Sequence, residues 1–171
     1  MSEGIRAFEK FVWLSPQMAG SWDLFNHLLG QKLRTVNSAS YKSFAFDQWN
    51  ACLQILGRPI NTLDSIQRSA ALVFEYYGRV MNGGHSLHFD VHGDSPDEEL
   101  LRALKELGAV GHGRILAEAY FLRREAKRKR GEEEYASESI EDLDLQFGRL
   151  SPDIPELLAR YFKAHPGSFP V

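Results

Sequence analysis

Apolar residues recur at spacings of three and four along much of the chain, which is the pattern of helices with one buried side. The clearest stripe consists of Ile66, Ala70, Val73, Tyr77 and Val80. Asn82-Gly83-Gly84 follows this stripe. It predicts the end of a helix, because glycine adopts the left-handed C-cap conformation without steric cost. At the other end, Thr62 is the expected N-cap, and Asp64 lies in the first turn, where the helix dipole favours an acid.

A second start signal is Ser95-Pro96-Asp97-Glu98. We expect Ser95 to cap this helix, Pro96 to occupy its first position and Glu98 to close a capping box. Four leucines form the expected buried side, and Gly108 is expected to end the helix. These leucines are Leu100, Leu101, Leu104 and Leu107.

The same periodicity predicts further helices in the rest of the chain. Their expected ranges are 3–13, 20–34, 40–56, 109–130, 140–148 and 153–164, with a loop over 131–139 and Ser151-Pro152 starting the last helix. Residues 1–60 are rich in aromatic side chains, which is typical of a packed region rather than a disordered tail. Strand-like alternation and internal repeats are not found. We therefore predict an all-α fold, a multi-helix bundle that forms one domain over residues 1–171.

Length and composition agree with a globular helical domain, and the sequence also bears on the cellular compartment. The chain has 171 residues, of which 43% are hydrophobic and 25% charged, as is ordinary for a globular domain. Cys52 is the only cysteine, so an intramolecular disulfide is excluded, and its place on an apolar helix side predicts a small core residue. The N-terminus shows no hydrophobic signal core, and no run approaches a membrane span. We expect a cytoplasmic protein.

Charge is distributed unevenly along the chain. Residues 1–131 carry 17 Lys and Arg against 14 Asp and Glu, whereas residues 132–171 carry 3 against 9. The acidic run comprises Glu132, Glu133, Glu134, Glu138, Glu141, Asp142 and Asp144. Such a run can present a negative face to a basic partner, or it can be solvated surface that pairs with the neighbouring basic run.

Three histidines offer a candidate metal site. If residues 85–92 are helical, His85, His88 and His92 lie on one side of the helix. Imidazoles presented in this way can bind zinc or nickel, with Asp90 or Asp94 nearby. The alternative is that they occupy half-buried positions after the glycine pair. Their spacing matches no standard zinc signature.

The basic run at residues 123–130 could contact phosphates of a nucleic acid. Aromatic side chains for base stacking are not interleaved with it, so the end of a solvated helix explains it equally well. Motifs of enzymes are not found either. Gly108, Gly111 and Gly113 follow no strand and precede no phosphate-binding lysine. No catalytic residue and no cofactor are predicted.

Residues of about 66–171 carry a set of short motifs that resembles a known family. The matching pieces are Asn82-Gly83-Gly84, Phe89, Gly93-Asp94, Ala103 to Ala109, Ile115 to Ala119, Leu143-Asp144, Phe147, Tyr161 and Phe169. Together they resemble the DNA-mimic-protein domain family of small helical bacterial proteins. The resemblance implies a helical fold, dimerisation and an acidic surface that imitates the phosphates of DNA and occupies a DNA-binding protein.

The preferred interpretation is a non-enzymatic protein-interaction module of bacterial type that acts on a basic or DNA-binding protein partner. A homodimer is also possible under this interpretation. One alternative is a metal- or small-ligand-binding domain centred on residues 82–94. Another is nucleic-acid binding through residues 123–130. The sequence identifies no individual partner.

Overall fold

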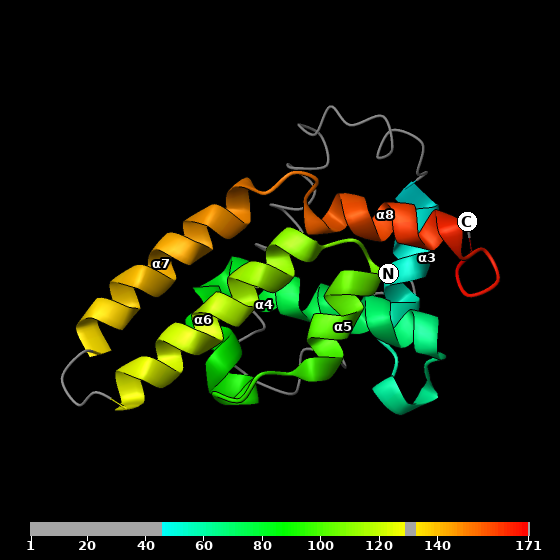
Figure 1. Ribbon diagram of the computed structural model, residues 1–171. Coiled ribbons are helices and arrows are strands. Elements are labelled where there is room, and N and C mark those ends of the chain that lie inside the picture. Colours follow the sequence, from blue (N-terminus) through cyan, green and yellow to red (C-terminus); the bar gives the residue numbers. More distant parts are fainter. Residues whose placement is uncertain (1–45, 129–132, 171) are drawn as a thin grey trace, which may run out of the picture. The chain divides into compact units, whose positions relative to one another are not determined.

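The structure, a computed structural model, describes residues 46–128 and 133–170, and most of these residues are helical. The elements are α3 (Phe46–Leu56), the short 3₁₀ helix η1 (Ile60–Thr62), α4 (Ser65–His92), α5 (Glu98–Glu106), α6 (Val110–Arg128), α7 (Glu133–Arg149) and α8 (Ile154–Ala164) (Figure 1). The described residues contain no strand, and the predicted all-α class is confirmed. The helices expected over 3–13 and 20–34 lie outside the described residues.

The chain divides into two compact units. The described part of the first comprises residues 46–71 and 158–170. Here Cys52 is fully buried, Phe162 and Phe169 lie with ring centroids 4.4 Å apart, and the side chain of Gln67 donates a hydrogen bond to the carbonyl of Ser168 at 2.8 Å. The prediction that the whole chain forms one domain stays a prediction.

The second unit, residues 72–157, holds the segments with candidate chemistry. Its helices α6 and α7 run antiparallel beside each other, and α5 also contacts α6 (Figure 1). The interior is built from aliphatic and aromatic side chains of all four helices. Fully or nearly fully buried examples are Val73, Tyr76, Phe89, Leu104, Leu116, Ala119, Leu143 and Phe147.

The glycine pair interrupts α4, and the chain resumes a helical conformation directly after it. Gly83 has φ −158° and Gly84 has φ +68°, so the helix consists of two helical segments joined by a kink. A positive φ is rarely adopted by residues with a side chain. The predicted stop at residues 82–84 is thus a kink, and a second segment, residues 85–92, follows it directly.

The helix starts differ from those expected. Asp64, not Thr62, caps α4: its carboxylate accepts the backbone N–H of Gln67 at 2.8 Å, and the Gln67 side chain accepts the N–H of Asp64 in return. Thr62 belongs to η1 and donates to the carbonyl of Pro59. A carboxylate gains from the helix dipole as well as from the hydrogen bond, whereas a hydroxyl gains mainly from the hydrogen bond.

The N-cap of α5 is also an aspartate instead of the predicted hydroxyl residue. Asp97 is the N-cap and accepts the backbone N–H of Leu100 at 2.9 Å, so Ser95 is not the cap and Glu98 is the first helical residue. Asp97 has an extended backbone, with φ −82° and ψ 96°, and its carboxylate accepts a hydrogen bond from the first turn of the helix. At the other end, Gly108 has φ +76° and ends α5 as predicted.

The last two helices also begin at other residues than expected. The backbone of α7 is helical from Glu133, so the loop predicted over 131–139 is wrong from that residue onward. Glutamate and alanine, which occur at its start, favour helix. In α8, Asp153 rather than Ser151 accepts the backbone N–H of Glu156, at 2.9 Å, and the helix begins at Ile154, one residue after the start of the predicted range 153–164.

Candidate functional site

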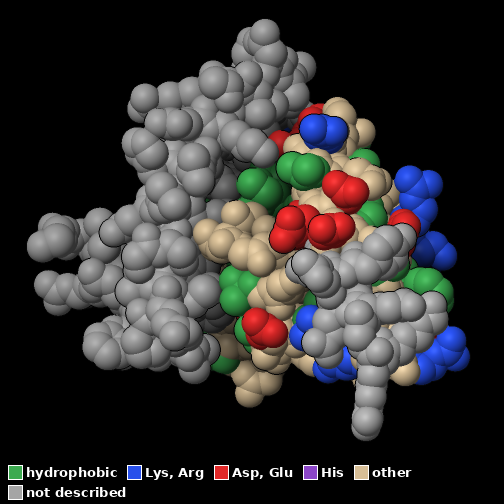
Figure 2. Space-filling model, turned by 90° about the vertical axis from the view of Figure 1, so that its left-hand side faces the viewer, with side chains coloured by type: hydrophobic (Ala, Val, Ile, Leu, Met, Phe, Trp, Pro, Cys, Tyr) green, Lys and Arg blue, Asp and Glu red, His purple; other side chains and the backbone are tan. Residues whose placement is uncertain are grey.

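Helix α7 has a buried side and an exposed acidic side. Ile140, Leu143 and Phe147 are buried, each with 3% exposure or less. Residues beside and between them face outward. These exposed residues include Glu138, Glu141, Asp142 and Leu145. Figure 2 shows the side of the molecule that lies on the left in Figure 1, where α7 runs, and acidic side chains gather there with hydrophobic ones among them.

Three of the predicted acidic residues lie outward together: Glu138, Glu141 and Asp142. No ion pair involves them within the described part of the chain. They are therefore available as a negatively charged row, one to two helical turns long, which we call the acidic row. Of the remaining members of the predicted run, Glu132 and the side chains of Glu133 and Glu134 lie outside what the structure describes.

Asp144 is different, because its carboxylate points into the unit. It accepts the backbone N–H of His85 at 3.0 Å and also the ring Nδ1–H of His85. Gly84 makes room for it: a Cβ atom at that position would lie 2.9 Å from Cγ of Asp144. The side chain of Asp144 therefore joins α7 to the kink of α4 and is not part of the outward acidic row.

His85 is also hydrogen-bonded to a buried tyrosine, Tyr76. With Nδ1–H donated to Asp144, its Nε2 accepts the hydroxyl of Tyr76 at 2.8 Å. Both His85 and Tyr76 have 0% exposure. Burial, with a smaller contribution from the charge of Asp144, raises the pKa of Tyr76 well above its usual range. The phenol thus stays protonated and serves as a fixed hydrogen-bond donor.

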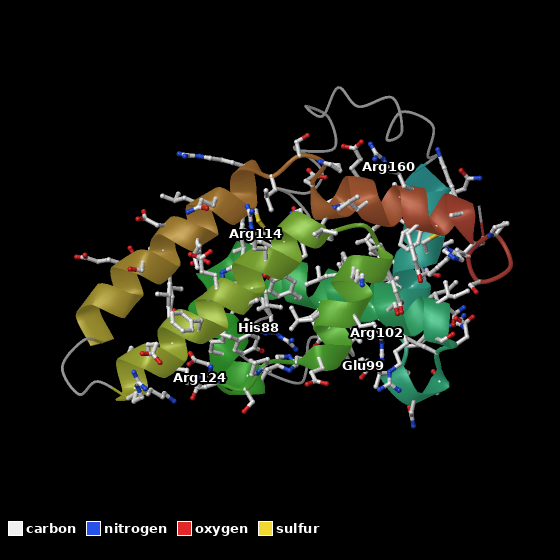
Figure 3. The ribbon with its side chains drawn as sticks, viewed as in Figure 1. His88, Glu99, Arg102, Arg114, Arg124 and Arg160 are labelled. Atoms are coloured by element: carbon white, nitrogen blue, oxygen red, sulfur yellow. The ribbon has the colours of Figure 1, made fainter. Side chains whose placement is uncertain are left out.

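The other two histidines of the candidate metal site face different partners. His88, which is labelled in Figure 3, is fully buried, and its Nε2 lies 3.1 Å from the hydroxyl of Tyr120. Its ring stacks on that of His92 with centroids 4.8 Å apart, and His92 accepts a hydrogen bond from Arg79. Burial lowers the pKa of His88 to about 3, so this imidazole is neutral at physiological pH.

The structure therefore does not turn the three imidazoles toward a common point. Both ring nitrogens of His85 are engaged in hydrogen bonds. Among the described residues, no three histidine, cysteine, aspartate or glutamate side chains are grouped as metal ligands. Nδ1 of His88 has no hydrogen-bond partner in this part of the chain. Zinc binding stays a prediction, and calorimetry on the wild type and on His88→Ala would test it.

Part of the basic run is occupied within the protein. Asp94 accepts hydrogen bonds from Arg123, at 3.1 Å, and from Lys127. Both contacts lower the pKa of the Asp94 carboxyl, with the Lys127 hydrogen bond first. Arg128 pairs with Glu125 at 3.0 Å. Arg124 is exposed, and Lys129 and Arg130 lie outside the described residues.

Two other expectations concern reactivity and location. Cys52 is fully buried, as predicted, and burial raises the pKa of its thiol to about 11, which opposes thiolate chemistry. In the described ranges, no helix combines the length and the apolar character that crossing a membrane requires.

The comparisons with known proteins give one family. A family model described as "DMP19-like protein" matches residues 61–165, well over half of the chain. The chain belongs to the DMP19-like protein family. This confirms the resemblance to DNA-mimic proteins that the glycine pair and the motifs after it indicate. The match includes all of α4 to α8, and hence both the acidic row and the Asp144–His85–Tyr76 connection. No curated protein and no solved structure shows significant similarity to the chain.

Sequence reasoning missed the inward role of Asp144 and the exposed Leu145. A signal for Asp144 exists, because Ile140, Asp144 and Phe147 follow the spacing of one helix side. Leu145, with 58% exposure, stands off the spacing of the buried residues of α7. Tyr76 and Tyr120 carry no local signal, since their partners lie 9 and 32 residues away along the chain.

Proposed function

We propose that this member of the DMP19-like family is a non-enzymatic, cytoplasmic interaction protein of bacterial type. It binds a basic protein through the acidic row on α7 and competes there with nucleic acid. The observation that carries the proposal is the outward position of Glu138, Glu141 and Asp142 in a chain of this family. The family resemblance supplies the class of partner, a DNA-binding protein.

The chemistry of the row fits such a partner. Carboxylates on successive turns are about 5.4 Å apart along the helix axis, so a basic surface meets several charges at once. Complementary charge mainly accelerates encounter and selects the partner. Leu145 adds an exposed apolar side chain beside Asp142. A partner whose basic surface also has an apolar depression should therefore bind better than a partner whose surface is only charged.

The internal connection supports the row without belonging to it. Asp144 ties α7 to the kink of α4, and this attachment fixes which side of α7 faces outward. We therefore include Asp144 in the proposal as a positioning residue. The resemblance also implies a homodimer, and self-association belongs to the same proposal.

Capture from an extract of the source cells tests the proposal. The acidic-row variant combines Glu138→Gln, Glu141→Gln and Asp142→Asn. A matched control removes the same number of exposed charges elsewhere in the second unit, by Asp90→Asn, Glu98→Gln and Glu118→Gln. We expect the wild type and the control to capture a basic DNA-binding protein. The amount that the acidic-row variant captures should be lower by about tenfold or more.

Salt provides a second measure on the captured partner. Its affinity should fall as the Debye length decreases from ~10 Å to ~3 Å, and it should fall less for the acidic-row variant. Equal capture by wild type and acidic-row variant would refute the proposal. If the captured material is nucleic acid and depends on Arg124 and Arg128, the nucleic-acid interpretation replaces it.

A further inference from the structure

The kink of α4 folds the two segments of this helix against each other. Arg79 of the first segment donates a hydrogen bond to Nε2 of His92 in the second. In a straight helix, residues 13 positions apart would be separated by about 20 Å along the axis. The rings of Tyr76 and His88, one from each segment, lie edge to face with centroids 5.2 Å apart. The glycine pair therefore brings polar side chains of both segments together.

His88 holds a buried hydrogen-bond donor that has no acceptor among the described residues. Burial raises the pKa of Tyr120, and a hydrogen bond from the backbone of Asp97 opposes this rise, as an N–H donor does. The phenol thus keeps its proton and donates it to Nε2 of His88. A neutral imidazole that accepts at Nε2 carries its own proton at Nδ1. This Nδ1 is buried and has no partner in the described part of the chain, which is rare in folded proteins.

Two further N–H donors accompany the buried one. Burial, followed by the charge of Arg79, lowers the pKa of His92, and because its Nε2 accepts from Arg79, its proton also lies at Nδ1. Within the described ranges, Arg79 uses two of its five N–H groups, toward Glu75 and His92. Its side chain is only 12% exposed. A cation and two imidazole N–H groups therefore meet at the fold of α4.

We propose that Arg79, His88 and His92 form a binding site for a small oxyanion, a carboxylate or a phosphate group, between the two segments of α4. The oxyanion accepts hydrogen bonds from Nδ1–H of His88 and from the guanidinium of Arg79, and the guanidinium bond is charge-assisted. His92 stacks on His88 with ring centroids 4.8 Å apart. Because His92 is exposed, its ring can turn aside on the picosecond-to-nanosecond timescale and return over the bound anion.

The same arrangement disfavours a metal ion. A metal bound at Nδ1 of His88 would need a nitrogen without a proton there, and it would lie near the positive charge of Arg79. The neighbouring acids are already engaged, since Glu75 pairs with Arg79 and the Asp97 carboxylate accepts the N–H of Leu100. The site therefore selects an anion. None of its residues belongs to the acidic row, so this inference goes beyond the proposed function and is tested separately from partner capture.

The ring nitrogens of His88 provide the first test. Nitrogen-15 NMR spectra of the histidine rings in the full chain identify the tautomer, and inorganic phosphate or acetate is then added. We expect the proton of His88 at Nδ1 and a saturable shift of this signal with at least one of the two anions, whereas sodium chloride at equal ionic strength should leave it unchanged. A response to phosphate alone indicates a phosphate ester as ligand, and a response to acetate alone indicates a carboxylic acid. A proton at Nε2, or no shift with either anion, overturns the proposal.

Substitutions of His88 separate the roles of its two nitrogens. The amide of asparagine can replace Nδ1–H, whereas the amide of glutamine can replace Nε2 and leaves no donor at Nδ1. Calorimetry with the anion that shifts the signal should show binding that His88→Gln weakens by about tenfold or more, and His88→Asn should bind at least about threefold more tightly than His88→Gln.

The cation of the site is tested with a matched control. Arg79→Gln should weaken anion binding by about tenfold or more, whereas Arg124→Gln removes an exposed charge on α6 and should bind like the wild type. Equal binding by the wild type and His88→Gln would overturn the proposal, and so would zinc binding that depends on His88 in place of anion binding. Circular dichroism verifies that each variant is folded, and the NMR test on the wild type decides the matter if a variant is not.

Discussion

At the scale of single residues, neighbouring acids on α7 have opposite roles. Asp142 points outward, whereas Asp144 accepts two hydrogen bonds from His85 beside the glycine kink. A charge count along the sequence treats them alike. The difference arises from helical spacing together with a partner 59 residues away, and only the spacing can be read from the sequence.

Substitution of Asp144 distinguishes these roles in stability. Asp144→Ala leaves the backbone N–H and the ring N–H of buried His85 without an acceptor, which should lower the free energy of unfolding by about 2–4 kcal/mol. Asp142→Ala removes an exposed charge and should change it by less than about 0.5 kcal/mol. Urea unfolding of both variants provides the comparison. Equal destabilisation would contradict the inward role of Asp144.

The kink residue offers a second test at this scale. Gly84→Ala imposes a side chain at φ +68° and also presses a Cβ against the Asp144 carboxylate. Gly93→Ala is the matched control, because Gly93 has φ +77° but no atom within 4 Å of the added Cβ. We expect Gly93→Ala to lower the free energy of unfolding by about 1 kcal/mol and Gly84→Ala to lower it by about 2–3 kcal/mol or more. Thermal unfolding of both variants is the measurement. Similar costs would show that Asp144 does not pack against Gly84.

At the scale of elements, the interiors of the helices are more predictable than their ends. The stripe from Ile66 to Val80 lies on the buried side of α4, since hydrophobic periodicity reflects burial directly. Helix starts are harder to predict from the sequence, because several polar residues compete for the first backbone N–H groups. In α4 and α5 the aspartate prevails over a neighbouring hydroxyl. The sequence contained all candidates but not the geometry that selects among them.

The corrected cap of α5 makes a direct prediction. Asp97→Ala removes the acceptor for the N–H of Leu100 and should destabilise the protein by about 1 kcal/mol. Ser95→Ala should have almost no effect, because Asp97 performs the capping. Chemical denaturation of the two variants is the measurement. If Ser95→Ala lowered the stability more than Asp97→Ala does, Ser95 would be the N-cap, as the sequence predicts.

At the scale of the whole molecule, buried neutral histidines set the response to acid. Burial lowers the pKa of His88 to about 3 and that of His112 to about 4. An unfolded chain takes up these protons near the ordinary pKa of about 6.5, so unfolding is favoured as the pH falls below that value. Stability should therefore be constant above pH ~7 and decrease by up to about 1.4 kcal/mol per pH unit for each histidine, down to their folded pKa values.

Removing one of these histidines should reduce that slope. His112→Gln should lower stability at pH 7 but make its loss between pH 6.5 and 4 shallower than in the wild type. Urea titrations at several pH values provide both quantities. An unchanged slope would mean that His112 is not held neutral by burial.

In the proposed function, the acidic row of α7 occupies the DNA-binding surface of a basic protein. Competition with duplex DNA tests it most directly. The protein captured by the wild type is bound to a labelled duplex, and the wild type or the acidic-row variant is then added. We expect the wild type to displace the duplex and the acidic-row variant to require about tenfold or more of the concentration. A complex in which the captured protein binds duplex and wild-type chain together, without competition, would contradict the proposed function.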